Sequence, residues 1–446
     1  MSKRWSIKTD WASLEEGPPE ERAGFATLGI FAYDAWLTAG HDRILQSVRD
    51  APYLSAYHLA EWLAWNWWRL RWEPRKTSSE WELSHSVASI GGGYIWPNIQ
   101  FVSDGTNITL VCRPTPERAR TPYRYINASV SVIPAIDFED EVDQFVGAVL
   151  QRLQDRQVAQ SNLRDVWQSV MQERHDPAMS RLRKLEALLG TDADEMDETL
   201  LRQFLNKADA TGDAALEEIA ANRTPGQNIP DIARLLDMGR EQGILTAPQD
   251  QITLQASVPH DSEAAWKLGS LVAQILRQQE GIALDKSITD AQLSRWYGAP
   301  ASVLEGSAYP EGKLDLSFSL LENDQQRRVL LRSAWKSGRR FELARLLGDA
   351  LIHATNDLMR PATRSYTYRQ KVQRAFAAEL LSPFEAVKNM LDEDYSMENQ
   401  QDVAHHFQVS DMTIRTLLAN HELIDRSELG DSGWRNVDNG RLQHQY

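Results

Sequence analysis

The sequence predicts an α+β protein with an N-terminal antiparallel sheet and a tryptophan-rich helix, a helical middle and a mainly helical C-terminal part. Short apolar runs separated by turn signals fill the first 140 residues, long helix-forming runs follow, and alternating apolar residues return after residue 310. A chain of 446 residues is too long for one ordinary core. We therefore expect three domains, at residues 1–155, 156–245 and 246–446.

The N-terminal helix is predicted to start at Ser55, because apolar residues follow it at helical spacing and Glu73-Pro74 ends the pattern. Ten of the fifteen tryptophans lie in the first 100 residues. Five crowd into this helix: Trp62, Trp65, Trp67, Trp68 and Trp72. Tryptophan also anchors protein interfaces, but we interpret the group as a core helix packed on the sheet.

The sheet is predicted from short apolar runs bounded by turns. Asp104-Gly105 between two such runs is a hairpin signal. Strands are predicted within 25–38 and at 84–90, 95–102, 107–113 and 128–136. After a helix at 139–155 the chain is predicted to be helical to about 228, with a further helix at 230–243. Strands at 314–320 and 327–332 precede the final helical segment, which begins at 338.

The charge, the cysteine content and the absence of certain motifs limit the classes of function that the sequence supports. The net charge of −15 weighs against general nucleic-acid binding, because an acidic chain is repelled by phosphates. The single cysteine, Cys112, fits a reducing compartment. We see no signal peptide and no membrane-spanning run, so we expect a cytoplasmic protein without a membrane partner. No P-loop or Rossmann glycine pattern occurs, and we expect no cofactor.

Three elements near the C-terminus carry a family resemblance. The first, residues 339–353, contains Arg340-Phe341, then Ala344 and Gly348. The second, residues 373–383, reads Gln-Arg-Ala-Phe-Ala-Ala-Glu-Leu-Leu-Ser-Pro, and the third spans 403–418. In this order they resemble the ImmA/IrrE metallopeptidase family, in which Arg-Phe-x-x-Ala precedes the zinc motif HExxH. The resemblance covers about residues 314 to 425 and implies a zincin-like domain.

The metal-binding residues of that family are replaced in this chain. HExxH holds zinc through two histidines one helical turn apart, and its glutamate polarises the bound water. By the resemblance, Arg345 and Asp349 replace the histidines, Leu346 replaces the glutamate, and Gln370 replaces the third ligand. Arginine cannot bind a metal ion. The resemblance therefore implies a degenerate, vacant zincin site, across which we expect an Arg345–Asp349 salt bridge.

Two alternatives remain open. Asp349 and His353 lie one helical turn apart and are weak candidates for displaced metal ligands, which would leave a zinc metallopeptidase. Residues 401–420 also fit a helix-turn-helix, in which Ser410 caps the second helix and Ile414 and Leu417 face the core. Residues 411–416 would then read DNA, but Arg415 is the only cation among them, so we do not favour DNA binding.

A basic and aromatic cluster lies between the first two elements. It consists of Arg360, Arg364, Tyr366, Tyr368, Arg369, Lys371 and Arg374. Arginines mixed with tyrosines suit an acidic partner or single-stranded nucleic acid, but we favour the simpler interpretation of a solvated helix start that balances an acidic chain. We list Arg364, Tyr366, Tyr368, Arg369, Arg374 and Arg415 as candidate partner-binding residues.

The resulting prediction is a non-catalytic protein-interaction or regulatory protein built on an inactive ImmA/IrrE-like fold. Because active relatives cleave repressors of phage and mobile elements, the resemblance implies a role in phage defence or mobile-element regulation.

Overall fold

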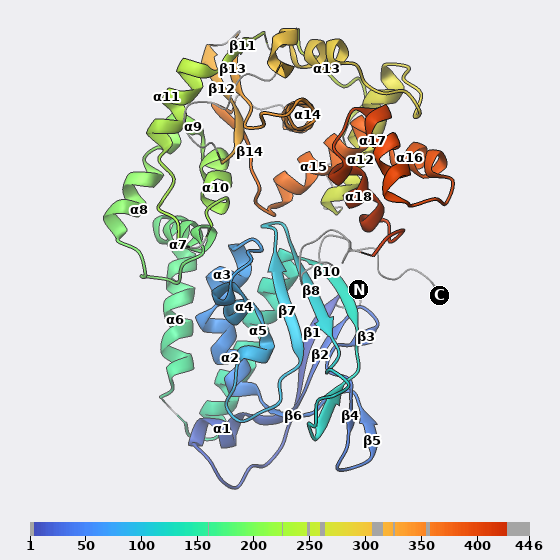
Figure 1. The fold of residues 1–446 in the computed structure, drawn as a ribbon. Helices are drawn as coiled ribbons and strands as arrows, with labels where there is room; N and C mark the ends of the chain where they lie inside the picture. The colour runs from blue at the N-terminus through green and yellow to red at the C-terminus, as the bar shows by residue number, and fades with distance from the viewer. Residues whose placement is uncertain are drawn as a thin grey trace. The chain divides into compact units, whose positions relative to one another are not determined.

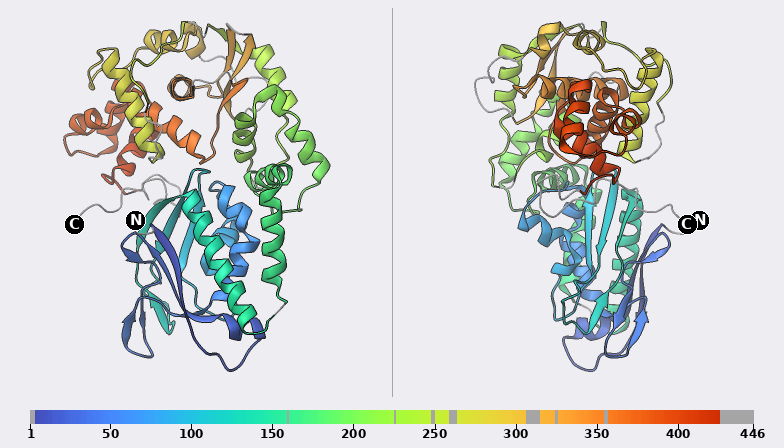
Figure 2. Two further views of the ribbon diagram at one scale, coloured as in Figure 1. Left: turned by 180° about the vertical axis from the view of Figure 1, so that it is seen from behind. Right: turned by 45° about the vertical axis from the view of Figure 1, so that its right-hand side comes forward.

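A computed structural model describes residues 4–158, 160–224, 226–247, 250–258, 264–305, 315–323, 326–353 and 357–425. They form two units (Figures 1 and 2). The first contains the described residues up to Leu201 together with Thr224 and Gly226, and the second contains Arg202–Arg223 and the described residues from Gln227 to 425. The predicted helical segment 156–245 is helical but divided between the units. Leu314 and residues 426–446 of the predicted C-terminal domain lie outside the described residues.

The first unit contains three antiparallel sheets, so the predicted N-terminal antiparallel sheet is confirmed. In one sheet β2 (Phe25–Ala32) pairs with β1 (Trp5–Trp11), β3 (Ala35–Trp36) and β6 (Tyr53–Ser55). In another β8 (Asn107–Arg113) lies between β7 (Asn98–Ser103) and β10 (Ser129–Pro134). In the third β4 (Gly40–Asp42) lies between β5 (Ser47–Arg49) and β9 (Tyr123–Tyr125).

The predicted hairpin between β7 and β8 forms for a local reason. The Asp104 carboxylate accepts hydrogen bonds from the backbone N–H of Thr106 at 3.1 Å and of Asn107 at 2.7 Å. Gly105 takes a φ of +90°, which glycine adopts without strain. The Asp-Gly pair therefore sets both the turn and the strand register.

The described part of the first unit also contains the helices α1 (Pro19–Gly24), α2 (Ala56–Trp65), α3 (Trp67–Trp72), α4 (Ser79–His85), α5 (Ala135–Asp155), α6 (Asn162–His175) and α7 (Pro177–Leu189). The Ser55 hydroxyl accepts the N–H of His58 and caps α2, as predicted. Trp67 and Trp68 are buried in the core, which confirms the core interpretation for them. Trp65 is 62% exposed and lies outside that core.

The strand predicted at 84–90 is wrong. This segment holds the end of α4 and the 3-10 turn η1 (Val87–Ser89). Ser78 caps α4 by accepting the N–H of Trp81, and the rings of Trp81 and His85 stack at 4.2 Å, one helical turn apart. Capping and ring stacking thus outweigh the apolar pattern that suggested a strand. The strand β1 was not predicted.

The second unit has one antiparallel sheet in the order β11 (Ile244–Thr246), β13 (Gln326–Leu330), β12 (Ser317–Asn323) and β14 (Met359–Ala362). Its helices are α9 (Ala208–Thr211), α10 (Asp213–Ala221), α11 (Ile232–Gln242), α12 (Ala265–Gln279), α13 (Asp290–Tyr297), α14 (Lys336–Ile352), α15 (Tyr368–Leu381), α16 (Phe384–Leu391), α17 (Met397–Phe407) and α18 (Asp411–Asn420). The 3-10 turn η3 (Ala301–Leu304) follows α13, and α8 (Glu198–Leu205) crosses the boundary between the units. None of the described helices is long and apolar enough to cross a membrane.

The helices α14 and α15 approach each other closely. A Cβ atom added at Gly348 of α14 would lie 2.5 Å from the ring of Phe376 on α15. Only glycine allows this contact, and the contact draws the polar faces of the two helices together. The candidate site lies between those faces.

Candidate functional site

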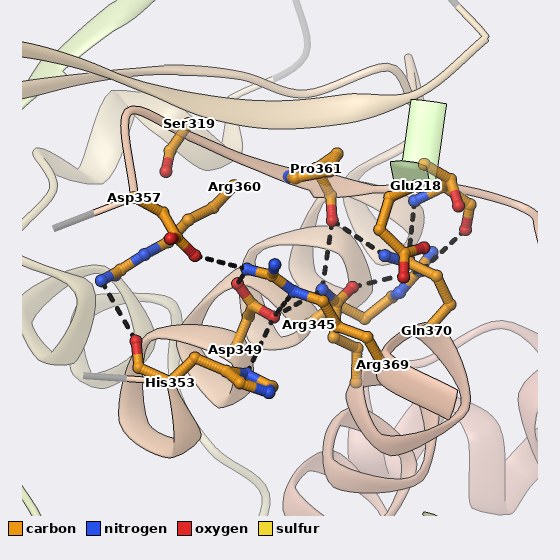
Figure 3. Close-up of polar contacts among 12 residues, drawn as sticks. Glu218, Ser319, Arg345, Asp349, His353, Asp357, Arg360, Pro361, Arg369 and Gln370 are labelled. Atoms are coloured by element: carbon orange, nitrogen blue, oxygen red, sulfur yellow. Dashed lines mark hydrogen bonds and ion pairs between the residues drawn. The ribbon is translucent and has the colours of Figure 1, made fainter. Parts of the chain in front are cut away.

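Three of the four residues predicted at the vacant zincin positions converge between α14 and α15 (Figure 3). The Arg345 Nη2 atom on α14 donates to the Gln370 Oε1 atom on α15 at 2.5 Å, and Asp349 lies one helical turn beyond Arg345. All three side chains are buried. The fourth residue, Leu346, packs into the hydrophobic core of the second unit. Leucine has no group that could act as an acid or a base.

Arg345 fills the space between the helices as a cation. Its Nη2 atom also donates to the backbone oxygen of Thr363 at 2.7 Å and to the Gln373 side chain at 3.4 Å. Burial, and then repulsion from Arg374, lowers the pKa of Arg345 to about 9. The side chain therefore still carries its charge at neutral pH, although each of these three acceptors is uncharged.

Asp349 is neutralised by a different residue. The Nε and Nη2 atoms of Arg369 donate to its two oxygens at 2.7 and 2.6 Å, and Gln373 donates at 2.9 Å. Burial alone would raise the pKa of Asp349, but Arg369 holds it well below its usual range. The predicted Arg345–Asp349 salt bridge is therefore wrong, because the two-pronged Arg369 contact matches a carboxylate better.

Arg369 was predicted to bind a partner, but its guanidinium pairs with carboxylates inside the second unit. Besides Asp349 it binds Asp357, whose Oδ2 atom lies 3.1 Å from its Nη2 atom. The Arg369 side chain is only 10% exposed. Its place as the counter-ion of Asp349 was not visible in the sequence, because twenty residues separate the two.

The same side chains close the outer edge of β14, the last strand of the sheet. The Pro361 oxygen accepts from the amides of Gln370 and Gln373, both at 3.1 Å. The Thr363 N–H donates to Gln370 at 2.7 Å, and the Thr363 oxygen accepts from Arg345. An edge strand attracts extended peptides through unpaired backbone groups. Here the oxygen of Pro361 and the N–H and oxygen of Thr363 are paired internally, and Pro361 has no N–H to offer.

A carboxylate that the sequence gave no reason to select also reaches this region. Glu218 of α10 accepts the hydroxyl of Thr367 at 2.7 Å and of Ser365 at 3.4 Å (Figure 3). Burial raises the pKa of Glu218 above its usual value. Its partners lie almost 150 residues further along the chain, so neither spacing nor motif could have identified it.

The residues present do not fit a zinc ion. The Nδ1 atom of His353 lies 3.4 Å from Asp349, but both Asp349 oxygens already bind Arg369. Arg345 places a positive charge where the resemblance expects a ligand, and would repel the metal. Within the described ranges, no three histidine, cysteine, aspartate or glutamate side chains are grouped so as to hold a metal ion.

The other candidate partner-binding residues do not form one exposed surface. Arg364 is exposed, and its backbone N–H donates to Asn222 at 2.8 Å. Arg374 lies over the ring of Tyr366 at 5.2 Å and donates to the Ser365 oxygen at 2.9 Å. Tyr366, Tyr368 and Lys371 are half-buried, and Arg360 is buried. Most of the cluster is thus half-buried, so it is neither a fully solvated helix start nor part of the core.

The predicted helix-turn-helix is present as α17 and α18. Gln408 takes a φ of +55° in the turn, and the Ser410 hydroxyl accepts the N–H of Thr413 and caps α18. Ile414 and Leu417 are buried, as predicted. Arg415 lies half-buried on α18, on a separate element from the basic cluster.

The chain matches no family model, no curated protein and no solved structure. The resemblance to ImmA/IrrE peptidases therefore rests on the three sequence elements.

Proposed function

We propose that the protein is a non-catalytic binding or regulatory protein, whose second unit is an ImmA/IrrE-like peptidase domain without its metal. One observation carries the proposal. Arg345 is a buried cation hydrogen-bonded to Gln370, and the resemblance assigns both residues to metal-ligand positions of the family. An arginine in this place repels a metal ion and offers no lone pair to it.

The closed strand edge supports the same proposal. A peptidase must hold an extended substrate next to its catalytic group, and an open strand edge is the usual way to do so. The outward backbone groups at Pro361 and Thr363 are already occupied by Gln370, Gln373 and Arg345. Substrate binding on this edge would require breaking these hydrogen bonds.

A protein partner is supported by an exposed apolar hairpin in the first unit. Ile44 and Leu45 lie at the turn between β4 and β5 and are 77% and 62% exposed, and Val48 on β5 is 68% exposed. The Asp42 carboxylate accepts the N–H of Ile44 and of Leu45, both at 2.9 Å, so the turn is held in shape while presenting these side chains. Exposed apolar groups on an ordered turn are typical of protein contacts.

The rival function is a metallopeptidase that uses Asp349 and His353. A hydrolysis assay separates the two: the full chain is incubated with casein and with a mixture of fluorogenic peptides, with zinc, cobalt or manganese added. We expect no cleavage above the buffer control. Cleavage that chelator abolishes, and that the His353→Ala variant lacks, would establish the peptidase instead.

The resemblance suggests phage defence or mobile-element regulation as the biological setting of this binding role. DNA binding through α18 is the less favoured function, because Arg415 is the only cation among the six residues that would enter the groove. A DNA gel shift at low salt that is absent in the Arg415→Ala variant would support DNA binding instead.

A further inference from the structure

The strand β1 forms an edge of its sheet, because among the described strands it pairs only with β2. In an antiparallel ladder, every second residue turns its backbone N–H and oxygen away from the neighbouring strand. The N–H of Leu28, which lies opposite Thr9, donates to the Pro52 oxygen at 3.0 Å, beside β6 on the other side of β2. Thr9, and Ile7 two residues before it, therefore direct their backbone groups away from β2.

The outer edge of β1 is only partly occupied. The Ile7 N–H donates to the Glu141 carboxylate at 2.7 Å. Among the described residues, the oxygen of Ile7 and both the N–H and the oxygen of Thr9 have no hydrogen-bond partner. The edge at β14 in the second unit differs, because the groups of Pro361 and Thr363 are paired internally. The edge of β1 thus offers the backbone groups to which an additional strand binds.

A pocket of about 380 Å³ lies along this part of the edge. Its lining includes residues 6–9 of β1, Phe31 of β2, and Glu141 and Phe145 of α5. Lys8 is exposed, and its Nζ atom lies 5.3 Å from the centre of the Phe31 ring. Ligand-binding pockets commonly have this volume and combine an apolar wall with a few polar groups. Open backbone groups, aromatic side chains and a cation meet in this pocket.

We propose that an extended segment of a protein partner binds in this pocket as an additional strand beside β1. Its backbone would donate to the Ile7 oxygen and accept from the Thr9 N–H, as in other cases of strand addition. Successive side chains of a strand point to opposite faces. One set would contact Phe145, and the other would lie near Lys8, so a segment of alternating apolar and acidic residues fits. This inference deepens the proposed function and rests on it, because it names the part of the partner that is bound.

Fluorescence anisotropy of a labelled octapeptide of alternating valine and glutamate tests the site on the full chain, and wild type should bind it saturably. Thr9→Pro removes an N–H that faces away from β2, which proline tolerates on an edge strand. It should weaken binding about tenfold, because an acceptor of the peptide is left unpaired. Thr9→Val keeps the N–H and is the matched control, which should bind like wild type. Urea unfolding verifies that both variants fold.

Lys8→Glu tests the same site without changing the backbone. This variant should bind the acidic octapeptide more weakly than wild type does, and should prefer the same peptide with lysine in place of glutamate. The proposal is overturned if wild type does not bind saturably, if Thr9→Pro and Thr9→Val bind equally well, or if Lys8→Glu changes nothing. A dimer of the chain alone that Thr9→Pro dissociates in sedimentation would also overturn it, because a second copy would then occupy the edge. These results leave the proposed function untouched, because the hydrolysis assay depends on Asp349 and His353.

Discussion

The two units each bury a network of charged side chains, and the networks differ in how their charges are balanced. In the first unit Arg69 lies between two carboxylates, with Glu73 at 2.7 Å and Asp192 at 2.9 Å. Fully buried His85 completes this network, with Nδ1 2.8 Å from the Trp81 oxygen. In the second unit two carboxylates share Arg369, whereas Arg345 is surrounded by neutral acceptors.

The difference lies in the groups that the buried arginines contact directly: Arg69 contacts carboxylates, whereas Arg345 donates to neutral oxygens. Removing one member of a buried ion pair leaves the other charge without a partner and is strongly destabilising. Removing a buried cation that donates to neutral oxygens leaves no such charge behind. Four effects on stability are expected, from the largest to the smallest, and all but the helix cap at Ser410 bear on this contrast.

The largest loss in the free energy of unfolding is expected for the Arg369→Leu variant. It leaves the Asp349 charge buried without a counter-ion, and breaking such a pair costs roughly 3–5 kcal/mol. Urea unfolding, with hydrogen exchange of α14 as the measure of the second unit, should show this loss. The double variant Asp349→Asn/Arg369→Leu should recover much of it. Equal losses in the single and double variants would show that the charge is not the cause.

The second effect is a pH dependence of the stability of the first unit, and it comes from buried His85. Burial lowers the pKa of His85 to about 3, below the value of about 6.5 in the unfolded chain. The unfolded state therefore binds a proton that the folded state does not, and stability falls as the pH drops below 6.5. Between pH 7 and pH 4 the loss should be about 3 kcal/mol.

Tryptophan fluorescence during urea unfolding reports mainly on the first unit, which holds most of the tryptophans. In the His85→Gln variant the stability of the first unit should change little between pH 7 and pH 4. The pKa of Asp349 is also depressed, so its contribution is present above the unfolded pKa of about 4 and is lost only at lower pH. If the free energy of unfolding of the second unit already falls at pH 6, the assignment of this acid sensitivity to His85 would be contradicted.

The third effect is a capping loss in α18. Ser410→Ala removes the hydroxyl that accepts the Thr413 N–H, and such a cap is worth roughly 1 kcal/mol. The melting temperature of the second unit should fall by a few degrees. Ser410→Asp, which keeps a capping oxygen, is the control and should retain most of the stability.

The smallest effect is expected for Arg345→Met, and it bears most directly on the contrast. Removing a buried charge whose hydrogen bonds go to neutral oxygens relieves its desolvation cost, which offsets the lost hydrogen bonds to Thr363 and Gln370. The free energy of unfolding should therefore change by no more than about 1 kcal/mol. Arg69→Met, the matched change in the first unit, should cost roughly 3–5 kcal/mol, because Glu73 loses its partner. Similar losses in both variants would remove the distinction between the networks.

Local signals predicted the elements that depend on local chemistry. Ser55, Ser410 and the Asp104-Gly105 turn each act within three residues, and each was predicted. The segment 84–90 was mistaken for strand, because its apolar content outweighed the capping signal at Ser78. The convergence of Arg345 and Gln370 followed from the resemblance alone. The true counter-ion of Asp349 and the approach of Glu218 depend on how α10, α14 and α15 pack, which residue spacing does not encode.

The most direct test is the zinc content of the full chain, purified without chelator from zinc-supplemented medium and measured by mass spectrometry. With the buried cation of Arg345 between α14 and α15 and both Asp349 oxygens bound to Arg369, the protein should carry far less than one zinc ion per chain. Close to one zinc ion per chain, lost in Asp349→Ala and in His353→Ala, would show that the site between α14 and α15 still binds its metal.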